Sequence, residues 1–438
     1  MTEKMKPSGI AWIGDIPHKW NCKQIAFMTD SRSGGTPDRN NLSYWENGTI
    51  PWMSSGEVNK VNVYETDEKI TEIATRNSSA KIVKANAVMV ALNGQGKTKG
   101  MSAILRIDSA CNQSLCAFSC HEGILHYEYL FWCFQTMYTY LRQMSGDDVR
   151  DGLAASYVKK QKIPVPEYQE QRAIADFLDA QCAQIDSVIA DIEKQIETLQ
   201  KYKKSLITEA VTKGLDRSAP MKDSEIEWIG FIPEKWDCKK LKYIISEPLQ
   251  YGANESGDDY REGHPRYIRI TDITEENTLK EEGKLSLPPD IAAPYILRDG
   301  DILFARSGAT VGKSFFYTME YGLAAFAGYL IRAKINQDMA LPKFVYYSTL
   351  GIGYENWKNT VFTQATIQNI GADKYAQFHV TLPGLEEQSG IVEYLDEKCA
   401  RIDDVVKNKQ AQLFTMQQHK KSLIYEYVTG KKRVTEVN

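Results

Sequence analysis

A chain of 438 residues and 49.7 kDa is long enough for two or three domains, each with its own core. Hydrophobic residues make up 42% of it and no apolar run approaches the ~18 residues of a membrane span, which excludes a membrane-spanning protein and predicts a cytoplasmic one. The formal net charge of −4, from 53 basic and 57 acidic residues, excludes a uniformly basic nucleic-acid coat but allows a local basic surface.

The chain contains a long internal repeat. The nonapeptide Trp12–Trp20, Trp-Ile-Gly-Asp-Ile-Pro-His-Lys-Trp, returns 216 residues later as Trp228–Trp236, with seven of its nine residues unchanged. Further on, Glu170-Gln171 matches Glu387-Gln388 at an offset of 217. Two copies of 217 residues account for 434 of the 438. Since solenoids repeat many short units, two long copies predict a pseudo-dimer on one chain with approximate two-fold symmetry.

Each copy begins with a globular part and ends with a long helix. Segments such as Ala87–Leu92 and Asp301–Ala305 are typical of buried strands, and Pro166 and Pro383 stand where a helix begins. These features predict a mixed α+β fold in which two globular domains are separated by two long helices. The predicted boundaries are a first domain at 1–166, a first helix at 167–214, a linker at 215–225, a second domain at 226–383, and a second helix with its tail at 384–438.

Both helices carry apolar residues in alternating steps of four and three, which indicates a coiled-coil seam. Two matched helices on one chain have each other as partners, and antiparallel pairing places the two domains at opposite ends. An amphipathic helix that packs only on its own domain is the alternative. The seam positions expected to contact the other helix or a partner are Leu178, Ile185, Ile189, Ile192, Ile196 and Leu199, and then Leu395, Ile402, Val406, Leu413, Met416 and Leu423.

Lys203 and Lys420 interrupt the seam at equivalent places. One explanation is a contact with a partner protein. The other is an aliphatic stem in the seam with its amine extended to water.

Two Gly-rich loops resemble phosphate-binding loops without matching the pattern. Ser307–Ser314 has serine where the first glycine is required, and Asn93–Thr98 has Ala91 at that place. The residues after both loops are typical of strands, not of the helix whose N-terminus holds a phosphate. We therefore interpret both as turns that present cationic side chains to phosphates or base edges. A solvated turn without a ligand is the alternative.

No catalytic or metal-binding pattern stands out. Cys111, Cys116, Cys120 and His121 have no common zinc spacing, and the second copy lacks them. The only Pro-Pro pair, Pro288-Pro289, lacks the flanking residues of a base-methylating clamp. We therefore expect a chain that is not itself an enzyme.

Further motifs occur in an order that resembles a known family. They include Gly35-Thr36-Pro37, Gly48–Trp52 and Gly300–Leu303, together with the duplicated nonapeptide and the duplicated Glu-Gln pair after the proline. In this order they resemble the DNA-specificity subunit of type I restriction-modification enzymes, over nearly the whole chain.

The resemblance implies that each globular domain is a target-recognition domain that reads one half of a bipartite, asymmetric site in double-stranded DNA. The helices would set the gap between the halves and bind two methyltransferase subunits, which carry S-adenosylmethionine and methylate adenine. A nuclease-translocase subunit that uses ATP and Mg²⁺ would join them to cut unmodified DNA. This chain would bind no cofactor itself. A two-lobed coiled-coil scaffold that binds only protein is the rival function, and a nucleotide hydrolase is a more distant one.

The predicted DNA-contacting residues lie on or near the two Gly-rich loops. They are Asn93, Gln95, Lys97 and Lys99 in the first copy, and Arg266, Arg269, Arg306, Ser307 and Lys313 in the second.

Overall fold

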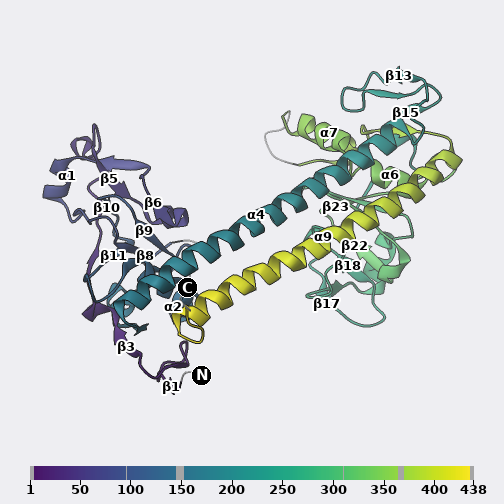
Figure 1. Ribbon diagram of the computed structural model, residues 1–438. Helices are drawn as coiled ribbons and strands as arrows, with labels where there is room; N and C mark the ends of the chain where they lie inside the picture. The colour runs from purple at the N-terminus through teal and green to yellow at the C-terminus, as the bar shows by residue number, and fades with distance from the viewer. Residues whose placement is uncertain (1–3, 95, 145–151, 309, 364–368, 435–438) are drawn as a thin grey trace. The chain divides into compact units, whose positions relative to one another are not determined.

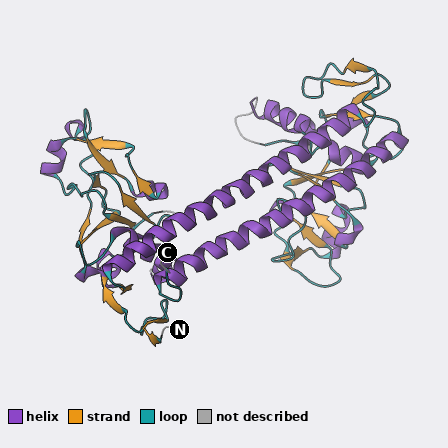
Figure 2. Ribbon diagram, viewed as in Figure 1, coloured by secondary structure: helices purple, strands orange, loops and turns teal. Residues whose placement is uncertain are grey.

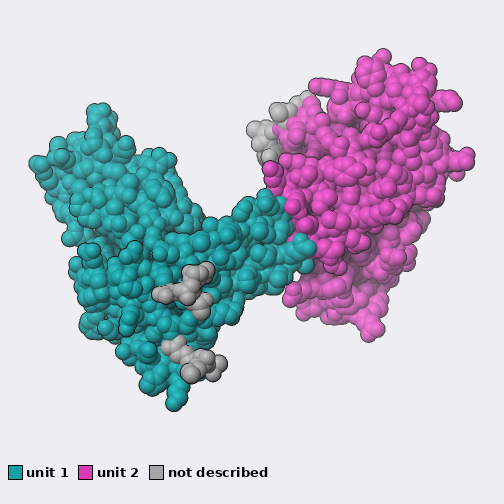
Figure 3. Space-filling model, viewed as in Figure 1, with its two compact units in different colours: residues 1–192, 411–438 teal, residues 193–410 magenta. Residues whose placement is uncertain are grey.

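The chain divides into two compact units. The computed structural model describes residues 4–94, 96–144, 152–308, 310–363 and 369–434 (Figures 1 and 2). Unit 1 consists of residues 1–192 and 411–438, and unit 2 of residues 193–410 (Figure 3). Each unit therefore joins one globular part to the beginning of one long helix and the end of the other.

The long helices are α4, Tyr168–Lys213, and α9, Leu385–Val428, with 46 and 44 residues. In unit 1, the ring of Phe177 near the start of α4 lies 4.4 Å from the ring of Tyr427 near the end of α9. In unit 2, the end of α4 contacts the first half of α9 in the same sense. The predicted antiparallel pair of long helices in a mixed α+β fold is confirmed.

The remaining elements of unit 1 are short apart from α2. Its strands are β1 Met5–Pro7, β2 Asp15–Pro17, β3 Asn21–Gln24, β4 Thr29–Ser33, β5 Ile50–Met53, β6 Asn62–Val63, β7 Glu68–Ile70, β8 Val88–Ala91, β9 Ser102–Leu105, β10 Ala110–Cys111, β11 Leu115–Cys120 and β12 Lys162–Val165. Its helices are α1 Glu72–Asn77, α2 Tyr127–Met144 and α3 Ala155–Lys160, with 3-10 turns η1 Ile25–Phe27, η2 Leu42–Tyr44 and η3 Ser55–Lys60.

Unit 2 has a comparable set of elements. Its strands are β13 Met221–Asp223, β14 Phe231–Pro233, β15 Asp237–Lys240, β16 Gln250–Tyr251, β17 Asp258–Asp259, β18 Arg266–Ile268, β19 Leu285–Ser286, β20 Ile302–Ala305, β21 Ser314–Phe316, β22 Ala324–Phe326, β23 Leu330–Ala333 and β24 His379–Leu382. Its helices are α5 Pro289–Ala292, α6 Pro342–Ser348, α7 Ile352–Thr363 and α8 Ala372–Tyr375, with 3-10 turns η4 Leu241–Tyr243, η5 Ile270–Asp272, η6 Ala293–Tyr295 and η7 Met319–Tyr321.

Each globular part contains a sheet with an equivalent strand order. Unit 1 has the strand order β4-β11-β8-β9, extended by β6, and unit 2 has the order β16-β23-β20-β21. Each unit adds a second sheet, β10-β5-β7 in unit 1 and β17-β19-β18-β22 in unit 2. The central strands β8 and β20 are buried at every residue, because neighbours cover both faces of the sheet. The repeat in the sequence is therefore a repeat of the fold.

The core of each unit runs without a break from the globular part into the helix pair. In unit 1, one cluster joins the fully buried Leu130 of α2 to Leu178 of α4 and Leu423 of α9. In unit 2, one cluster joins Phe344 of α6 to residues of both long helices. The helices are therefore part of both cores, and we expect neither globular part to be stable without them.

The duplicated nonapeptide joins the two helices in each unit. In unit 1, Trp20 is 2% exposed, and its indole N–H donates to Glu170 at the start of α4 over 3.2 Å. The same ring packs against Gly430, just past the end of α9, where a Cβ would lie 2.8 Å from it. In unit 2, Trp236 donates to Glu387 at the start of α9 over 3.0 Å and packs against Gly214 after α4. Both glycines have φ near +70°, which a helix C-terminus commonly requires.

The glutamine of each duplicated Glu-Gln pair is completely buried. The side-chain oxygen of Gln171 accepts from the N–H of His126, and its amide donates to two backbone carbonyls, those of Ile124 and Pro166. Gln388 makes the corresponding three bonds in unit 2. These bonds satisfy backbone groups at the joint between the globular part and its helix, where water has no access.

The lysines that interrupt the seam form ion pairs between the helices. The Lys203 amine lies 2.6 Å from both carboxylate oxygens of Asp403, within unit 2. In unit 1, the Lys420 amine contacts both carboxylate oxygens of Asp186, one of them at 2.6 Å. A cation in the seam with an acid on the opposite helix favours one register of pairing over others.

Reversing one of these charges tests that contact. We expect Lys203→Glu to lower the free energy of unfolding by about 1 kcal/mol, because it places two carboxylates together at a partly exposed site. Adding Asp403→Lys restores the attraction and should recover most of the stability. Urea denaturation followed by circular dichroism, run as a double-mutant cycle, measures the coupling. A double variant no more stable than the single one would show that the pair contributes nothing.

All eight cysteines are free thiols, and burial raises the pKa of the Cys182 and Cys399 thiols to about 11. None of the helices in the described part of the chain combines the length and apolar composition of a membrane-spanning segment.

Candidate nucleic-acid interface

Both Gly-rich loops are hairpin connections, and they occupy equivalent places in the equivalent sheets of the two units. In unit 1 the loop joins β8 to β9, and the N–H of Ala91 donates to Met101 O over 2.9 Å. In unit 2 the loop joins β20 to β21, and Ala305 donates to Lys313 O over 2.7 Å. A strand follows each loop, as predicted, so neither loop offers the helix N-terminus of a phosphate-binding loop.

Glycine is required at the next-to-last position of each loop. Gly100 has φ +84° and donates to Ala91 O, while Gly312 has φ +82° and donates to Ala305 O. A side chain in this region of φ is strained, so both hairpins close on a glycine. The closing hydrogen bonds are thus shared by both copies, whereas the segments that they enclose differ in length and in residues.

In unit 1, side chains of helix α2 hydrogen-bond to the backbone of the loop. The Tyr138 hydroxyl donates to Lys97 O over 2.7 Å, and the Arg142 guanidinium donates to the carbonyls of Gly96 and Lys99. The side chains of Asn93 and Lys97 are exposed, and Lys99 is only 8% exposed. The loop therefore presents Asn93 and Lys97 to solvent from an anchored backbone. Gln95 lies outside the described residues.

In unit 2, Arg306 lies between aromatic and amide partners. Its guanidinium carbon is 5.1 Å from the centroid of the Tyr251 ring, and its Nε donates to Asn369 Oδ1 over 3.3 Å. Its backbone N–H donates to Tyr329 O, and the Tyr329 side chain is 63% exposed. Arg306 and the neighbouring Ser307 are half-buried. A guanidinium held in place by a ring and an amide is suited to bidentate contact with an acceptor edge.

Two of these neighbours, Tyr251 and Tyr329, were not predicted from the sequence. Tyr251, Tyr329 and Asn369 come from three separate segments, and no spacing relates them to Arg306. In the sequence, each is only an aromatic or amide residue within a turn. Many other positions fit that description, so it could not have identified them.

Lys313 is tied to the adjacent loop. Its amine donates to the carbonyl of Thr274, and burial lowers the pKa of the ammonium group, against the opposing effect of Glu275 and Glu276. The side chain therefore joins the hairpin to the loop after η5.

Arg266 and Arg269 are engaged with neighbouring groups of unit 2. Arg266 is 6% exposed, and its guanidinium binds Glu281 at 2.8 Å and the carbonyl of Lys280. Arg269, half-buried, pairs with Asp272 at 2.7 Å. Of the predicted DNA-contacting residues in this unit, Arg306 and Ser307 thus share one surface loop, whereas Arg266 lies inside the second sheet.

The predicted seam residues of the long helices are all buried or half-buried. The buried ones are Leu178, Ile185, Ile192, Leu395, Ile402 and Leu423, and the half-buried ones are Ile189, Ile196, Leu199, Val406, Leu413 and Met416.

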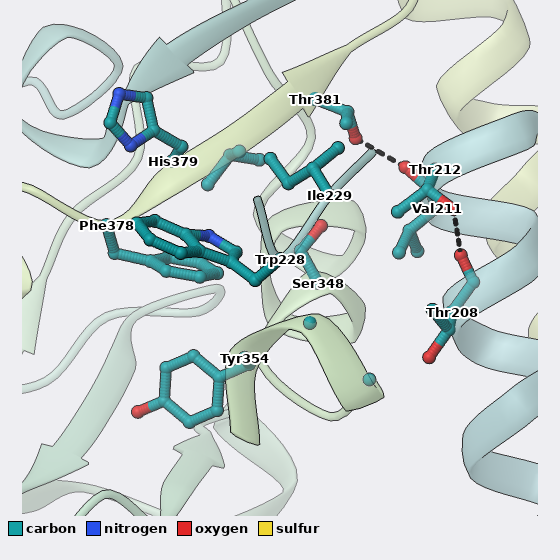
Figure 4. A pocket seen from close by; sticks show the side chains of 13 residues that line it. Thr208, Val211, Thr212, Trp228, Ile229, Ser348, Tyr354, Phe378, His379 and Thr381 are labelled. Carbon is teal, nitrogen blue, oxygen red and sulfur yellow. Dashed lines mark hydrogen bonds between the residues drawn. The ribbon is translucent and has the colours of Figure 1, made fainter. Parts of the chain in front are cut away.

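A small cavity of about 20 Å³ lies where the end of α4 meets the second nonapeptide (Figure 4). Its lining includes Thr208 and the indole of Trp228, whose N–H has no partner among the described residues. In unit 1 the position equivalent to Thr208 is Tyr425, whose hydroxyl donates to the carbonyl of Ile13 over 3.0 Å. A space of this size accommodates about one water molecule and is far too small for a nucleotide.

Within the described residues, no group of three or more His, Cys, Asp or Glu side chains is placed to hold a metal ion. A Gly-rich hairpin at the same place in the sheet is a surface feature of both copies.

Comparison with known proteins agrees with the duplicated architecture. The family model for the type I restriction modification DNA specificity domain matches residues 17–198 and again 233–431. The MjaIX specificity subunit of Methanocaldococcus jannaschii is 24% identical over 447 residues, which cover 97% of this chain and 96% of that protein. The EcoR124I/EcoR124II specificity subunit of Escherichia coli is 31% identical over 178 residues, 38% of this chain and 42% of that relative.

A solved structure has the same fold over nearly the whole chain. It is a chain from a study of complex assembly and conformational transition of the type I R-M system, with a TM-score of 0.68 at 16% identity. The match covers 95% of this chain and 99% of that one. Since the family model matches both copies, this chain belongs to the family of DNA specificity subunits of type I restriction-modification systems.

Proposed function

We propose that residues 1–166 and 226–383 are two target-recognition domains, each reading one half of a bipartite, asymmetric DNA site. The observation that carries this proposal is the pair of hairpins, which occupy the same place in the sheet and close with the same hydrogen bonds but differ in length and in the residues they present. Two hairpins at equivalent places that carry different side chains are suited to two domains that recognise different half-sites. Asn93, Lys97, Arg306 and Ser307 are the proposed contacts with bases or backbone.

The antiparallel helices connect the two readers and set the gap. Modules that read the same face of a duplex lie about one helical turn, ~34 Å, apart. Because both helices enter both cores, the connection consists of packed helices and not of a flexible linker. A change in helix length is thus expected to alter the gap and not the half-sites.

The chemistry belongs to partner subunits. Specificity subunits of this family are not catalytic and work within a type I complex. We propose two methyltransferase subunits that carry S-adenosylmethionine and methylate adenine, docked on the helix pair, and a nuclease-translocase subunit that uses ATP and Mg²⁺. This chain would hold none of these cofactors, and the complex would act on DNA in the cytoplasm.

Methylome sequencing tests the proposal. Cells expressing this chain with its methyltransferase subunits should acquire one bipartite motif that carries methyladenine on both strands. A matched strain lacking only this chain should show no such motif. An intact complex that leaves DNA unmethylated would instead support the rival, a two-lobed scaffold that binds only protein.

A further inference from the structure

The backbone of Arg306 is fixed on both sides at the start of the second hairpin. Its N–H donates to Tyr329 O over 2.9 Å, and its carbonyl accepts from the N–H of Ile370 over 2.9 Å. The carbonyl of the preceding residue, Ala305, accepts from the Tyr375 hydroxyl over 2.7 Å. The fold thus determines the point from which the Arg306 side chain extends.

The Arg306 side chain is held as well, but only on one side of its guanidinium group. Its Nε donates to Asn369 Oδ1 over 3.3 Å, and the guanidinium carbon lies 5.1 Å from the centroid of the Tyr251 ring. That ring is itself anchored, because the Tyr251 hydroxyl accepts from the N–H of Ala372 over 3.0 Å. In the part of the chain that the structure describes, no hydrogen bond or ion pair reaches Nη1 or Nη2 of Arg306. The guanidinium therefore offers a pair of neighbouring donors to a ligand.

The first unit has different chemistry at the same place. Arg306 is the first residue after β20, and its equivalent after β8 is Leu92, which is 6% exposed. The strand register aligns Tyr251 with Ser33, which has no ring to hold a guanidinium. A contact that both half-sites require, such as one with a phosphate, would favour the same residue in both units. The donor pair of Arg306 is therefore suited to a group that only one half-site presents at this place.

Of the four bases, guanine alone matches two neighbouring donors. Its major-groove edge presents two acceptors, O6 and N7, whereas adenine presents an acceptor and a donor, thymine one acceptor beside a methyl group, and cytosine a donor. We propose that the half-site read by unit 2 contains a guanine, whose O6 and N7 accept from the two Nη groups of Arg306 in the major groove. Tyr251 and Asn369 are positioning residues that orient this guanidinium. This inference rests on the proposed function and names one base of its target.

The test uses the complex of this chain with its methyltransferase subunits, and fluorescence anisotropy measures its affinity for duplexes that carry the methylome-derived motif. Each guanine of the motif is replaced in turn by 7-deazaguanine, which pairs normally but lacks the N7 acceptor. At one guanine the replacement should weaken binding roughly 10-fold, the effect of losing a hydrogen bond to a charged group. The Arg306→Ala complex should bind the duplex equally well with and without that replacement. Arg306→Gln should behave likewise, because an amide offers a donor and an acceptor instead of two donors.

Variants of Tyr251 test the positioning role. Tyr251→Ala should lower the preference for guanine over the other three bases at that position about 2- to 5-fold, the usual effect of losing a partly exposed cation–π contact. Tyr251→Phe keeps the ring and should retain the preference. Affinity for a scrambled duplex should stay the same in both variants, which a general loss of structure would not allow. Tyr260→Ala is the matched control, because Tyr260 is 42% exposed against 40% for Tyr251 and its ring lies 4.2 Å from the amine of Lys284.

Three results would overturn the inference. One is a motif in which no guanine responds to the loss of N7, and another is a response that persists in the Arg306→Ala complex. The third is an equal loss of affinity for the motif and the scrambled duplex in Arg306→Ala, which would make Arg306 a phosphate contact. Failure of the proposed function looks different, because the unmutated complex would then bind the bipartite and the scrambled duplex equally well.

Discussion

Trp236→Ala is expected to lower the free energy of unfolding of unit 2 by about 3–5 kcal/mol, the usual cost of removing a buried tryptophan ring. The ring is 1% exposed and packs between the start of α9 and the glycine after α4, so its removal leaves a cavity where the two helices are joined. Urea denaturation followed by circular dichroism at 222 nm measures the change without relying on tryptophan fluorescence.

Two further variants separate the causes. Trp236→Phe keeps most of the ring but removes the N–H donor to Glu387, so a decrease of about 1–2 kcal/mol is expected. Tyr202→Ala removes a ring that is 57% exposed on α4 and should change the free energy by less than about 0.5 kcal/mol. If Trp236→Ala unfolds at the same urea concentration as the unmutated chain, the nonapeptide does not hold the helices together.

Arg306→Ala is expected to relax the DNA motif at one base of one half-site while the other half stays unchanged. Removing a base-reading guanidinium costs about 1–3 kcal/mol in discrimination, or roughly 5- to 150-fold in the preference for the correct base. The contacts of Arg306 with Tyr251 and Asn369 hold its side chain in one orientation, which discrimination requires. Methylome sequencing of cells expressing the variant complex reports the motif directly.

Lys97→Ala, in the other hairpin, provides the contrast. If Lys97 contacts phosphate, its removal weakens binding to all sequences alike and leaves the motif unchanged. Arg261→Ala, an exposed arginine of unit 2 away from the hairpin, serves as the charge-matched control. Should Arg306→Ala and Lys97→Ala leave both the motif and the affinity untouched, neither hairpin contacts DNA.

Much of the architecture follows from the sequence alone, because it depends on periodicity. The step pattern of four and three after Pro166 and Pro383 predicts two long paired helices, and the duplicated nonapeptide predicts two equivalent units. The antiparallel sense does not follow from periodicity alone, and the contact of Phe177 with Tyr427 establishes it. Regular patterns of this kind are local, so they can be read without knowing which segments meet.

The roles of individual residues depend on contacts between distant segments, which no local pattern encodes. In the sequence, Trp20 and Trp236 are only the last residues of a repeated nonapeptide, but in the fold each joins the start of one helix to the end of the other. In the sequence, Lys203 is only a polar interruption of the apolar seam. The structure shows that it pairs with Asp403, which lies 200 residues away in the chain.

The surface proposed to contact DNA shows the same division. The sequence indicated which loops are rich in glycine and basic residues. Only the fold shows that Arg266 is buried and bound to neighbouring groups, whereas Arg306 lies on a surface loop. That separation is set by burial and by the neighbours Glu281, Tyr251 and Asn369. Whether an arginine faces solvent or a carboxylate is an energetic outcome of tertiary packing, because desolvating a cation is favourable only when a partner is brought to it.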